Sequence, residues 1–269
     1  MSSTGAVSRV WGGLVAFRGT SSRRADLWLA VAAFATVGGL WQASTTFGWT
    51  SPQFLPGPVA VFDALVTMFR DQNFLWHIGV SFVRVWSAFL ISLVMALPLG
   101  ILMSTYRLAG ALNEPLIDFI RYLPVPALVP LTIIWLGIGE ETKIALLWMG
   151  TFFQLVLLIA DDMKRVPQEY VEIGFTLGAK PFRILKDVAL PAMLPSLVDN
   201  LRITLGWCWT YLIIAEIVAS DSGIGFVIWT ARRYVKTPEV MAGILTIGLL
   251  GLLCDQAIRM AHRRWFRYL

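Results

Sequence analysis

The segment IGVSFVRVWSAFLISLVMALPLGILM, residues 78–103, decides the fold class, because it is long and almost wholly apolar, with Arg84 as its single charged residue. A helix needs about 20 consecutive apolar residues to cross the hydrocarbon core of a bilayer. In lipid a chain must satisfy its backbone hydrogen bonds internally, which a helix does. A barrel strand would instead alternate polar and apolar residues. This segment is therefore expected to be a transmembrane helix.

Five further segments have a similar composition and length. The six expected transmembrane helices span approximately residues 27–43, 78–103, 116–136, 144–160, 201–219 and 240–255. Hydrophobic side chains make up 57% of the chain and charged ones 14%, and the mean hydropathy is +0.69. Soluble domains average about 25% charged residues. The sequence therefore predicts an all-α integral membrane protein.

Residues 50–71 separate the first two segments and differ from them. Ser-Pro and Pro-Gly-Pro sequences, which are typical of turns, lead into VAVFDALVTMFRD, residues 59–71. The apolar residues of this stretch recur with a helical period. Such an amphipathic helix is expected to lie on the membrane surface.

The positive charges outside the spans predict the orientation. Most of the 22 Lys and Arg residues lie near the two termini or in residues 161–196, the longest loop between spans. Loops rich in these residues stay in the cytoplasm. We therefore expect both termini to be cytoplasmic, with an uncleaved tail over residues 1–26 and a basic tail over residues 261–269.

The loop contains the sequence EIGFTLGAKPFRILKDVALP, residues 172–191. The preceding and overlapping stretch VPQEYVEIGFTLG, residues 166–178, predicts a short helix, and Gly178 can adopt the positive φ that ends it. Pro181 favours the start of a second helix. The loop is therefore expected to form a helix-turn-helix, although an ordinary amphipathic loop with a helix-ending glycine is an alternative.

The same stretch resembles the cytoplasmic EAA loop of bacterial ABC import permeases. Glu172, Gly178, Leu190 and Pro191 fall in register with that motif, and Gly174 keeps a small residue where the motif has one. The sequence departs from the motif at two positions, where Ile173 replaces the usual Ala and Val188 replaces Ile.

Two further stretches resemble the permeases for nitrate, sulfonates, taurine and bicarbonate. RYLPVPALVPLTIIWLGIGEETKIALL, residues 121–147, is similar to a segment in which Pro-x-Pro leads to a Trp-Phe-Gly-Ile-Gly-Glu turn, with Leu136 in place of Phe. AEIVASDSGIGFVIWTA, residues 215–231, is similar to an Ala-Glu segment followed by Gly-Leu-Gly, with Ile224 in place of Leu. The resemblance covers about residues 27–260 in matching order.

The resemblance implies a permease domain over residues 27–260 whose coupling loop spans residues 161–196. Two copies of the chain, or the chain and a paralogue, would bind two ABC ATPase subunits on the cytoplasmic face of the bacterial inner membrane. ATP and Mg²⁺ would be bound by those subunits, and this chain would bind no cofactor. The residues that would couple it to the ATPase are Glu172, Gly174, Gly178, Ala179, Leu190 and Pro191.

The resemblance also implies a separate periplasmic or extracellular solute-binding protein, which would deliver cargo to residues 137–143 and 220–238. The expected cargo is a small oxyanion or sulfonate, such as nitrate, taurine or an alkanesulfonate. A homodimer and a heterodimer both stay open. Nucleic acid is not an expected partner, because the positive charges lie at the ends of apolar segments.

Glu216 lies deep in an expected span, where an ionisable group is costly and usually faces a partner or a water-filled cavity. It could pair with Arg84 or Arg202 and hold helices together. We favour that role, since a bare carboxylate on the path would repel an anionic cargo. Alternatively, it could line the path together with three aromatic residues of its segment: Trp207, Trp209 and Tyr211.

Prolines and a second set of charges mark the third expected span. Pro124 and Pro126 would break or kink a helix at membrane depth, which is tolerated where the backbone lines a cavity. Glu114, Asp118 and Arg121 stand at helical spacing and are expected to form a salt-bridged face at the membrane interface. The pair Asp199 and Arg202 has the same interpretation.

A membrane enzyme and an ATP-independent channel or secondary transporter are the alternatives. The sequence has no nucleophile motif and no GxxxxGK[ST] phosphate loop, so the chain is not expected to be an enzyme or the ATPase itself. A channel or secondary transporter would not need the stretch at residues 172–191. Cys208 and Cys254 lie in apolar runs, and no Cys or His spacing predicts a metal site.

Overall fold

The computed structural model describes residues 22–217 and 220–267. The chain divides into two compact units, residues 1–63 and residues 64–269. All regular secondary structure in the described residues is helical, as the apolar segments predict.

The first unit contains α2 (Arg23–Thr46) and the beginning of α3 (Pro58–Asp71), which continues into the second unit. The Ser22 hydroxyl caps α2 by accepting a 3.2 Å hydrogen bond from the Ala25 N–H, a group that has no partner within the helix. The indole N–H of Trp41 donates to the Pro56 carbonyl at 2.9 Å. This bond folds the Pro-Gly-Pro turn back onto the end of α2.

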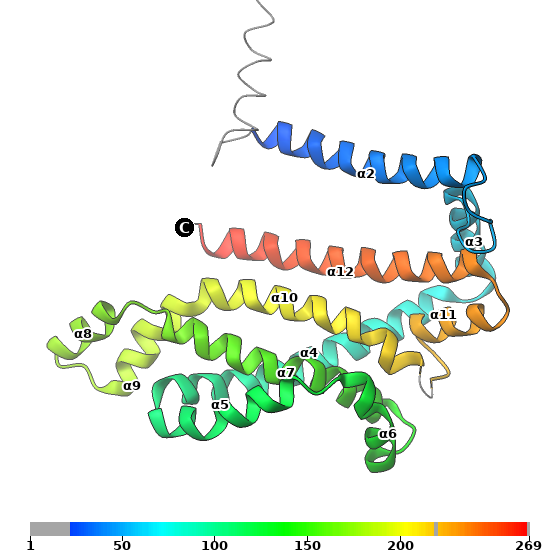
Figure 1. Ribbon diagram of the computed structural model, residues 1–269. Helices are drawn as coiled ribbons and strands as arrows, with labels where there is room; N and C mark the ends of the chain where they lie inside the picture. The colour runs from blue at the N-terminus through cyan, green and yellow to red at the C-terminus, as the bar shows by residue number, and fades with distance from the viewer. Residues whose placement is uncertain (1–21, 218–219, 268–269) are drawn as a thin grey trace, which may run out of the picture. The chain divides into compact units, whose positions relative to one another are not determined.

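Four long helices form the framework of the second unit. They are α4 (Phe74–Thr105), α7 (Glu140–Lys164), α10 (Leu190–Ile217) and α12 (Thr237–Trp265). Helix α7 packs against α4 and α10, and α12 packs against α10 (Figure 1). The core of this packing is apolar and almost fully buried, and it includes Leu155, Val156, Ile159 and Met193.

The close contact between α4 and α7 depends on Gly100. A Cβ atom built at Gly100 would lie 2.7 Å from Cγ2 of Ile159 and 2.8 Å from the Val156 carbonyl oxygen. Real side chains do not tolerate such distances, because protein interiors are close-packed. The glycine therefore lets the two helices approach each other at the centre of the core.

Shorter helices fill the ends of the second unit. Helix α5 (Arg107–Arg121) packs on α4 and α7, α6 (Val125–Leu136) packs on α7, and α11 (Ile224–Arg233) packs on α10 and α12. Helices α8 (Gln168–Thr176) and α9 (Pro181–Ile184) connect α7 to α10, and a π-helical turn, Leu185–Ala189, leads into α10. Figure 1 shows α8 and α9 at one end of this unit, and α6 and α11 at the other.

Length and composition identify fewer spans than the sequence predicts. Among the described helices, α2, α4, α7 and α12 are long and apolar enough to cross a membrane, and α5 with α6 would add a fifth span as a bent pair. Helix α10 is 28 residues long but carries Asp199, Arg202 and Glu216, which lower its hydropathy. These criteria therefore support four or five spans rather than six.

The expected span over residues 116–136 is broken at its prolines, which the sequence predicted to break or kink it. Helix α5 ends at Arg121, α6 begins at Val125, and the two axes are bent by 101°. Pro124 stands at the break. Its ring disfavours a helical conformation for Leu123, and it has no N–H to continue the hydrogen-bond ladder.

Two other predicted boundaries differ from the structure. Helix α10 begins at Leu190 rather than at residue 201, and the π-helical turn Leu185–Ala189 runs into it without a break, so that Pro191 lies within a continuous helical segment. Val218 and Ala219, the predicted end of that span, lie outside the described residues. Helix α12 continues to Trp265, so residues 261–265 of the expected C-terminal tail are helical.

Candidate functional site

The α8–α9 element, residues 168–189, is the first candidate site. Gly178 follows α8 with a φ of 74°, a left-handed conformation that glycine adopts without strain. The Gly178 N–H donates to the Phe175 carbonyl at 2.9 Å, and the Ala179 N–H donates to the Gly174 carbonyl at 3.0 Å. This pair of bonds is a Schellman motif, which satisfies the last carbonyls of the helix and fixes the direction of the turn.

The two helices of the element pack through Gly174. A Cβ atom there would lie 2.9 Å from Cγ1 of Ile184, and both residues are buried. Only the absence of a side chain at Gly174 allows this contact. The α8–α9 element is therefore held by a glycine at its turn and another at its internal contact.

The outer surface of the α8–α9 element is unusually apolar. Large apolar side chains on it are half exposed or more: Tyr170, Ile173, Phe175, Leu177 and Phe182. Leu177 is 80% exposed and Phe182 is 75% exposed. A contiguous exposed apolar surface of this kind marks a site of contact with a membrane or a protein partner.

The remaining residues of the predicted coupling motif are distributed over this region. Glu172 is exposed on α8 and accepts a 2.8 Å hydrogen bond from the amide of Gln168. Ala179 lies in the turn. Leu190 and Pro191 form the start of α10, so the motif ends inside a long helix rather than in the loop.

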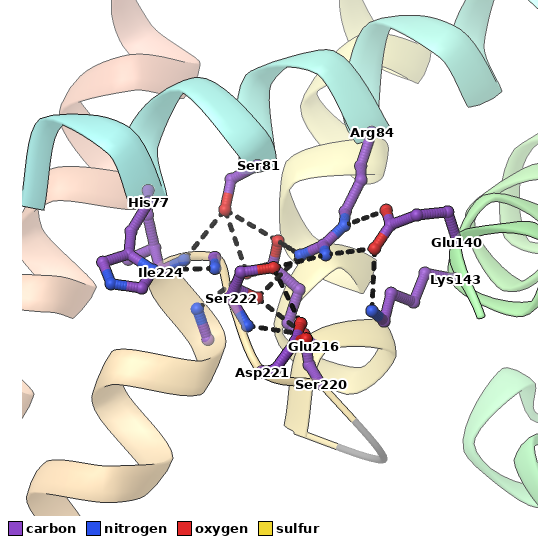
Figure 2. A network of polar contacts seen from close by, with 12 residues as sticks. His77, Ser81, Arg84, Glu140, Lys143, Glu216, Ser220, Asp221, Ser222 and Ile224 are labelled. Carbon is purple, nitrogen blue, oxygen red and sulfur yellow. Dashed lines mark hydrogen bonds and ion pairs between the residues drawn. The ribbon is translucent and has the colours of Figure 1, made fainter. Parts of the chain in front are cut away.

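A network of polar groups, with Arg84 and Glu216 buried and Glu140 half-exposed, is the second candidate site. It lies at the ends of α7 and α10 that are remote from the α8–α9 element (Figures 1 and 2). At its centre is Arg84 of α4, which is 1% exposed. Its Nη1 donates to Oε1 of Glu216 at 2.8 Å, and its Nη2 and Nε donate to the Glu140 carboxylate at 2.5 and 2.6 Å. The guanidinium therefore joins α4, α7 and α10.

Glu216 receives further donors that satisfy both of its oxygens. The Ser81 hydroxyl donates to Oε1 at 2.7 Å, and the Gly225 N–H donates to Oε2 at 2.7 Å. Gly225 lies in the first turn of α11, where N–H groups have no intrahelical partner and favour a negative charge. The carboxylate therefore also ties the start of α11 to α10.

Two glycines make room for the Glu216 side chain. A Cβ atom at Gly223 would collide with the carboxylate, and one at Gly225 would lie 2.7 Å from Cβ of Glu216. Gly223 also has a φ of 104°, which side chains rarely tolerate. The sequence Gly-Ile-Gly at residues 223–225 is thus required by the geometry of the buried carboxylate.

The network contains residues that the sequence did not single out. Glu140 accepts a 2.8 Å hydrogen bond from Lys143, and Ser222 accepts one of 2.8 Å from Arg84 through its carbonyl. Ser81 is fully buried. Neither residue stood out in the sequence, because Glu140 lies within a turn motif and Ser81 lies within an apolar span, three residues before Arg84. Two arginines were considered as partners for Glu216. Arg84 forms the ion pair with it, whereas Arg202 pairs with Asp255, its Nε 3.2 Å from Oδ1 of that residue.

The other residues predicted for a translocation path are separated by the fold. Trp207 and Tyr211 line a cavity of about 480 Å³ between α5, α6, α7 and α10. Trp209 is 3% exposed and packs away from this cavity, with its ring 6.3 Å from that of Phe82 on α4. Pro124 and Pro126 stand at the start of α6. The predicted group therefore divides among the cavity, the core and the polar network.

Comparison with known proteins relates most of the chain to one family. Residues 96–267 match the family described as binding-protein-dependent transport system inner membrane component. A probable ABC transporter permease protein of Brucella melitensis is 34% identical, over 91% of this chain and 98% of the relative. The taurine transport system permease protein TauC of Escherichia coli is 32% identical, over 88% of each chain.

Solved structures show the same fold. A chain of the MetNI methionine ABC transporter, described as inward facing, matches 71% of this chain and 98% of its own length, with a TM-score of 0.58 and 20% identity. At that identity the match concerns the helical architecture and not the cargo.

Proposed function

Because the chain belongs to the family of binding-protein-dependent transport system inner membrane components and is thus an ABC import permease, we propose that it carries a small oxyanion or sulfonate across the inner membrane. Transport is driven by ATP that a separate subunit hydrolyses. The permease itself performs no covalent chemistry. It provides the path and the moving helices.

The observation that carries this proposal is the α8–α9 element. It combines a fixed backbone, set by the Schellman motif at Gly178, with an exposed apolar surface that includes Leu177 and Phe182. We propose that each ATPase subunit binds this surface in a groove on the cytoplasmic side. A fixed element transmits a rigid-body movement, whereas a flexible loop would absorb it.

Two long helices connect the α8–α9 element with the polar network. Helix α7 reaches the element through its C-terminus, and α10 begins directly after the π-helical turn. With a rise of 1.5 Å per residue, α10 is about 42 Å long. Movement of the α8–α9 element therefore reaches Glu140 and Glu216, where α7 and α10 meet α4, and we propose that this movement opens and closes the path.

The proposed assembly has three kinds of protein subunit. Two copies of this permease, or the permease with a paralogue, lie in the lipid bilayer and bind two ATPase subunits that hold ATP and Mg²⁺. A periplasmic or extracellular solute-binding protein delivers the cargo. Both termini and the α8–α9 element lie on the cytoplasmic side. The binding protein meets the opposite side, at residues 137–143 and 220–238. The similarity to a taurine permease supports a cargo that carries a sulfonate group.

Affinity purification of the tagged chain from its native membrane, with quantitative mass spectrometry, tests the proposal. We expect an ABC ATPase to accompany the chain in equal amount. A chain that purifies without an ATPase would contradict the proposal and favour an ATP-independent channel or secondary transporter.

A matched pair of variants locates the binding surface. Phe182→Asp places a charge on the α8–α9 element and should release the ATPase, since it disrupts an apolar contact. Tyr234→Asp is the control, because Tyr234 is 73% exposed at the opposite end of the second unit. Equal ATPase recovery with both variants would rule out the α8–α9 element as the docking surface.

A further inference from the structure

The cavity at the break between α5 and α6 has no role in the coupling described above. Its volume of about 480 Å³ is typical of a site for a small molecule. Most of its wall is apolar or aromatic, and its lining includes Leu128, Leu131, Phe153, Trp207 and Tyr211. Such a wall can hold the uncharged part of a ligand.

Arg121 is the only charged residue among the described residues that line this cavity. It is the last residue of α5, so the break in the helix brings its guanidinium to the cavity wall. Its neighbour in the wall is Gln154 of α7, whose Oε1 lies 3.4 Å from Nη1 of Arg121. A single positive group in an apolar cavity selects for a negative charge, because it lowers the energy of an anion there and raises that of a cation.

The guanidinium has hydrogen-bonding capacity to spare. Of its five N–H donors, those on Nη2 bond the Asp118 carboxylate at 3.0 Å and the Tyr122 hydroxyl at 3.2 Å. Nη1 makes only the long contact with Gln154, and the buried Nε has no acceptor among the described residues. The interfacial pair expected from the sequence, Asp118 with Arg121, is therefore present but uses only part of this side chain.

The cavity lies at the break between α5 and α6 but away from the ends of α7 and α10. Gly150 and Gln154 are central in α7, and Trp207 and Tyr211 lie within α10. In transporters, discontinuous helices form binding sites near the middle of the membrane, and a charge at that depth faces a partner or a polar cavity. The break between Arg121 and Val125 provides this combination.

We propose that the cavity is an anion-binding station for the cargo, in which Arg121 holds a sulfonate, carboxylate or other oxyanion head group and Trp207 and Tyr211 contact a short uncharged body. This inference rests on the proposed function and narrows its cargo to anions with a small apolar or neutral remainder. A cationic solute would be repelled by Arg121.

A pair of probes of similar shape tests the inference on the purified complex in detergent. Ethanesulfonate carries the charge that Arg121 would bind, and ethyl methyl sulfone is its uncharged counterpart. Titration calorimetry should show ethanesulfonate binding at least tenfold more tightly. Equal affinity for the two probes would overturn the inference.

Three variants of the complex assign the binding to Arg121. Arg121→Gln should weaken ethanesulfonate binding at least tenfold, whereas Arg121→Lys keeps the charge and should retain most of the affinity. Arg202→Gln is the matched control, because Arg202 also has an acidic partner three residues before it and is similarly buried, but does not line the cavity. Unchanged binding in Arg121→Gln, or an equal loss in Arg202→Gln, would overturn the assignment.

Asp118→Asn separates binding from a structural role. If Arg121 acted only through its ion pair, loss of the Asp118 charge would weaken ethanesulfonate binding as much as Arg121→Gln does. We expect Asp118→Asn to bind ethanesulfonate as tightly as the wild type or more tightly, because the positive charge of Arg121 is then no longer partly neutralised by Asp118.

The ATPase content of the same samples distinguishes the two proposals. A complex that contains the ATPase but does not discriminate between the probes contradicts only the anion station. A chain that purifies alone contradicts the proposed coupling, and the comparison of ethanesulfonate with the sulfone on that chain still decides the inference about Arg121.

Discussion

The Glu216 carboxylate of α10 accepts a 2.8 Å hydrogen bond from the Arg84 guanidinium of α4, and each residue is only 1% exposed. Residues 132 positions apart in the sequence thus form a buried ion pair. A buried ion pair is not by itself strongly stabilising, because both charges lose their hydration. Loss of the Glu216 charge would leave Arg84 with Glu140 as its remaining acidic partner. It would also weaken the hydrogen bonds that Arg84, Ser81 and the Gly225 N–H donate to the carboxylate.

Glu216→Gln should therefore lower the stability of the permease. We expect a loss of about 1 to 3 kcal/mol from buried donors left with a poorer acceptor, measured by thermal unfolding in detergent. Glu114→Gln is the control, since the Glu114–Lys164 pair is 3.4 Å long and each side chain is 46% exposed. An exposed pair contributes at most about 1 kcal/mol. If both variants unfold at the wild-type temperature, the network has no structural role.

Gly178→Val should uncouple transport without preventing membrane insertion. A β-branched residue at a φ of 74° is strained, at a cost of about 1 to 2 kcal/mol, and would distort the turn between α8 and α9. We expect a normal amount of protein in the membrane but a large loss of ATP-driven uptake of radiolabelled ethanesulfonate, the first cargo to test. Gly178→Asn should retain uptake, because asparagine tolerates this conformation. Wild-type uptake in Gly178→Val would exclude a coupling role for the turn.

Gly225→Ala and Gly248→Ala should change stability in opposite directions, although both replace a helical glycine. At residue 225 the new methyl group would lie 2.7 Å from Cβ of Glu216. At residue 248 it would have no heavy atom within 4 Å outside its own chain neighbours and the nearby backbone of α12. We expect a loss of about 1 to 3 kcal/mol at residue 225 from overpacking. At residue 248 we expect a gain of about 0.5 to 1 kcal/mol, because alanine has less freedom to lose on folding. Unfolding temperatures that rise in both variants would show that the Glu216 site is not tightly packed.

The apolar segments predicted the helices well wherever hydrophobicity alone decided the structure. Residues 78–103 and 144–160 lie wholly within α4 and α7, which extend a few residues beyond them at each end. The third expected span is broken because hydrophobicity continues across Pro124, whereas the helical hydrogen-bond ladder does not. Helix α10 starts well before the expected span at residue 201, because its first residues continue the helical backbone of the π-helical turn, which hydrophobicity does not mark.

For the candidate sites, features set by a local sequence pattern were predictable, whereas contacts between distant residues were not. The turn at Gly178 was predictable, since a local sequence pattern determines its conformation. A pair between Glu216 and Arg202 could be excluded from the sequence, because both lie on one predicted helix, 14 positions apart and about 21 Å along its axis. The pairing of Glu216 with Arg84 was not predictable, because it depends on the packing of α4 against α10. The roles of Glu140 and Ser81 likewise depend on contacts between residues far apart in the chain.

The polar network has a consequence for how relatives of this chain can diverge. Its ion pairs join two acids, Glu140 and Glu216, to two bases, Arg84 and Lys143, so the formal charges of these four residues cancel. The Glu140 side chain is 53% exposed, but the other three are buried, and an unbalanced charge at a buried position is costly. Acid and base should therefore be lost or regained together during evolution, and covariation among these four positions is expected across homologous permeases.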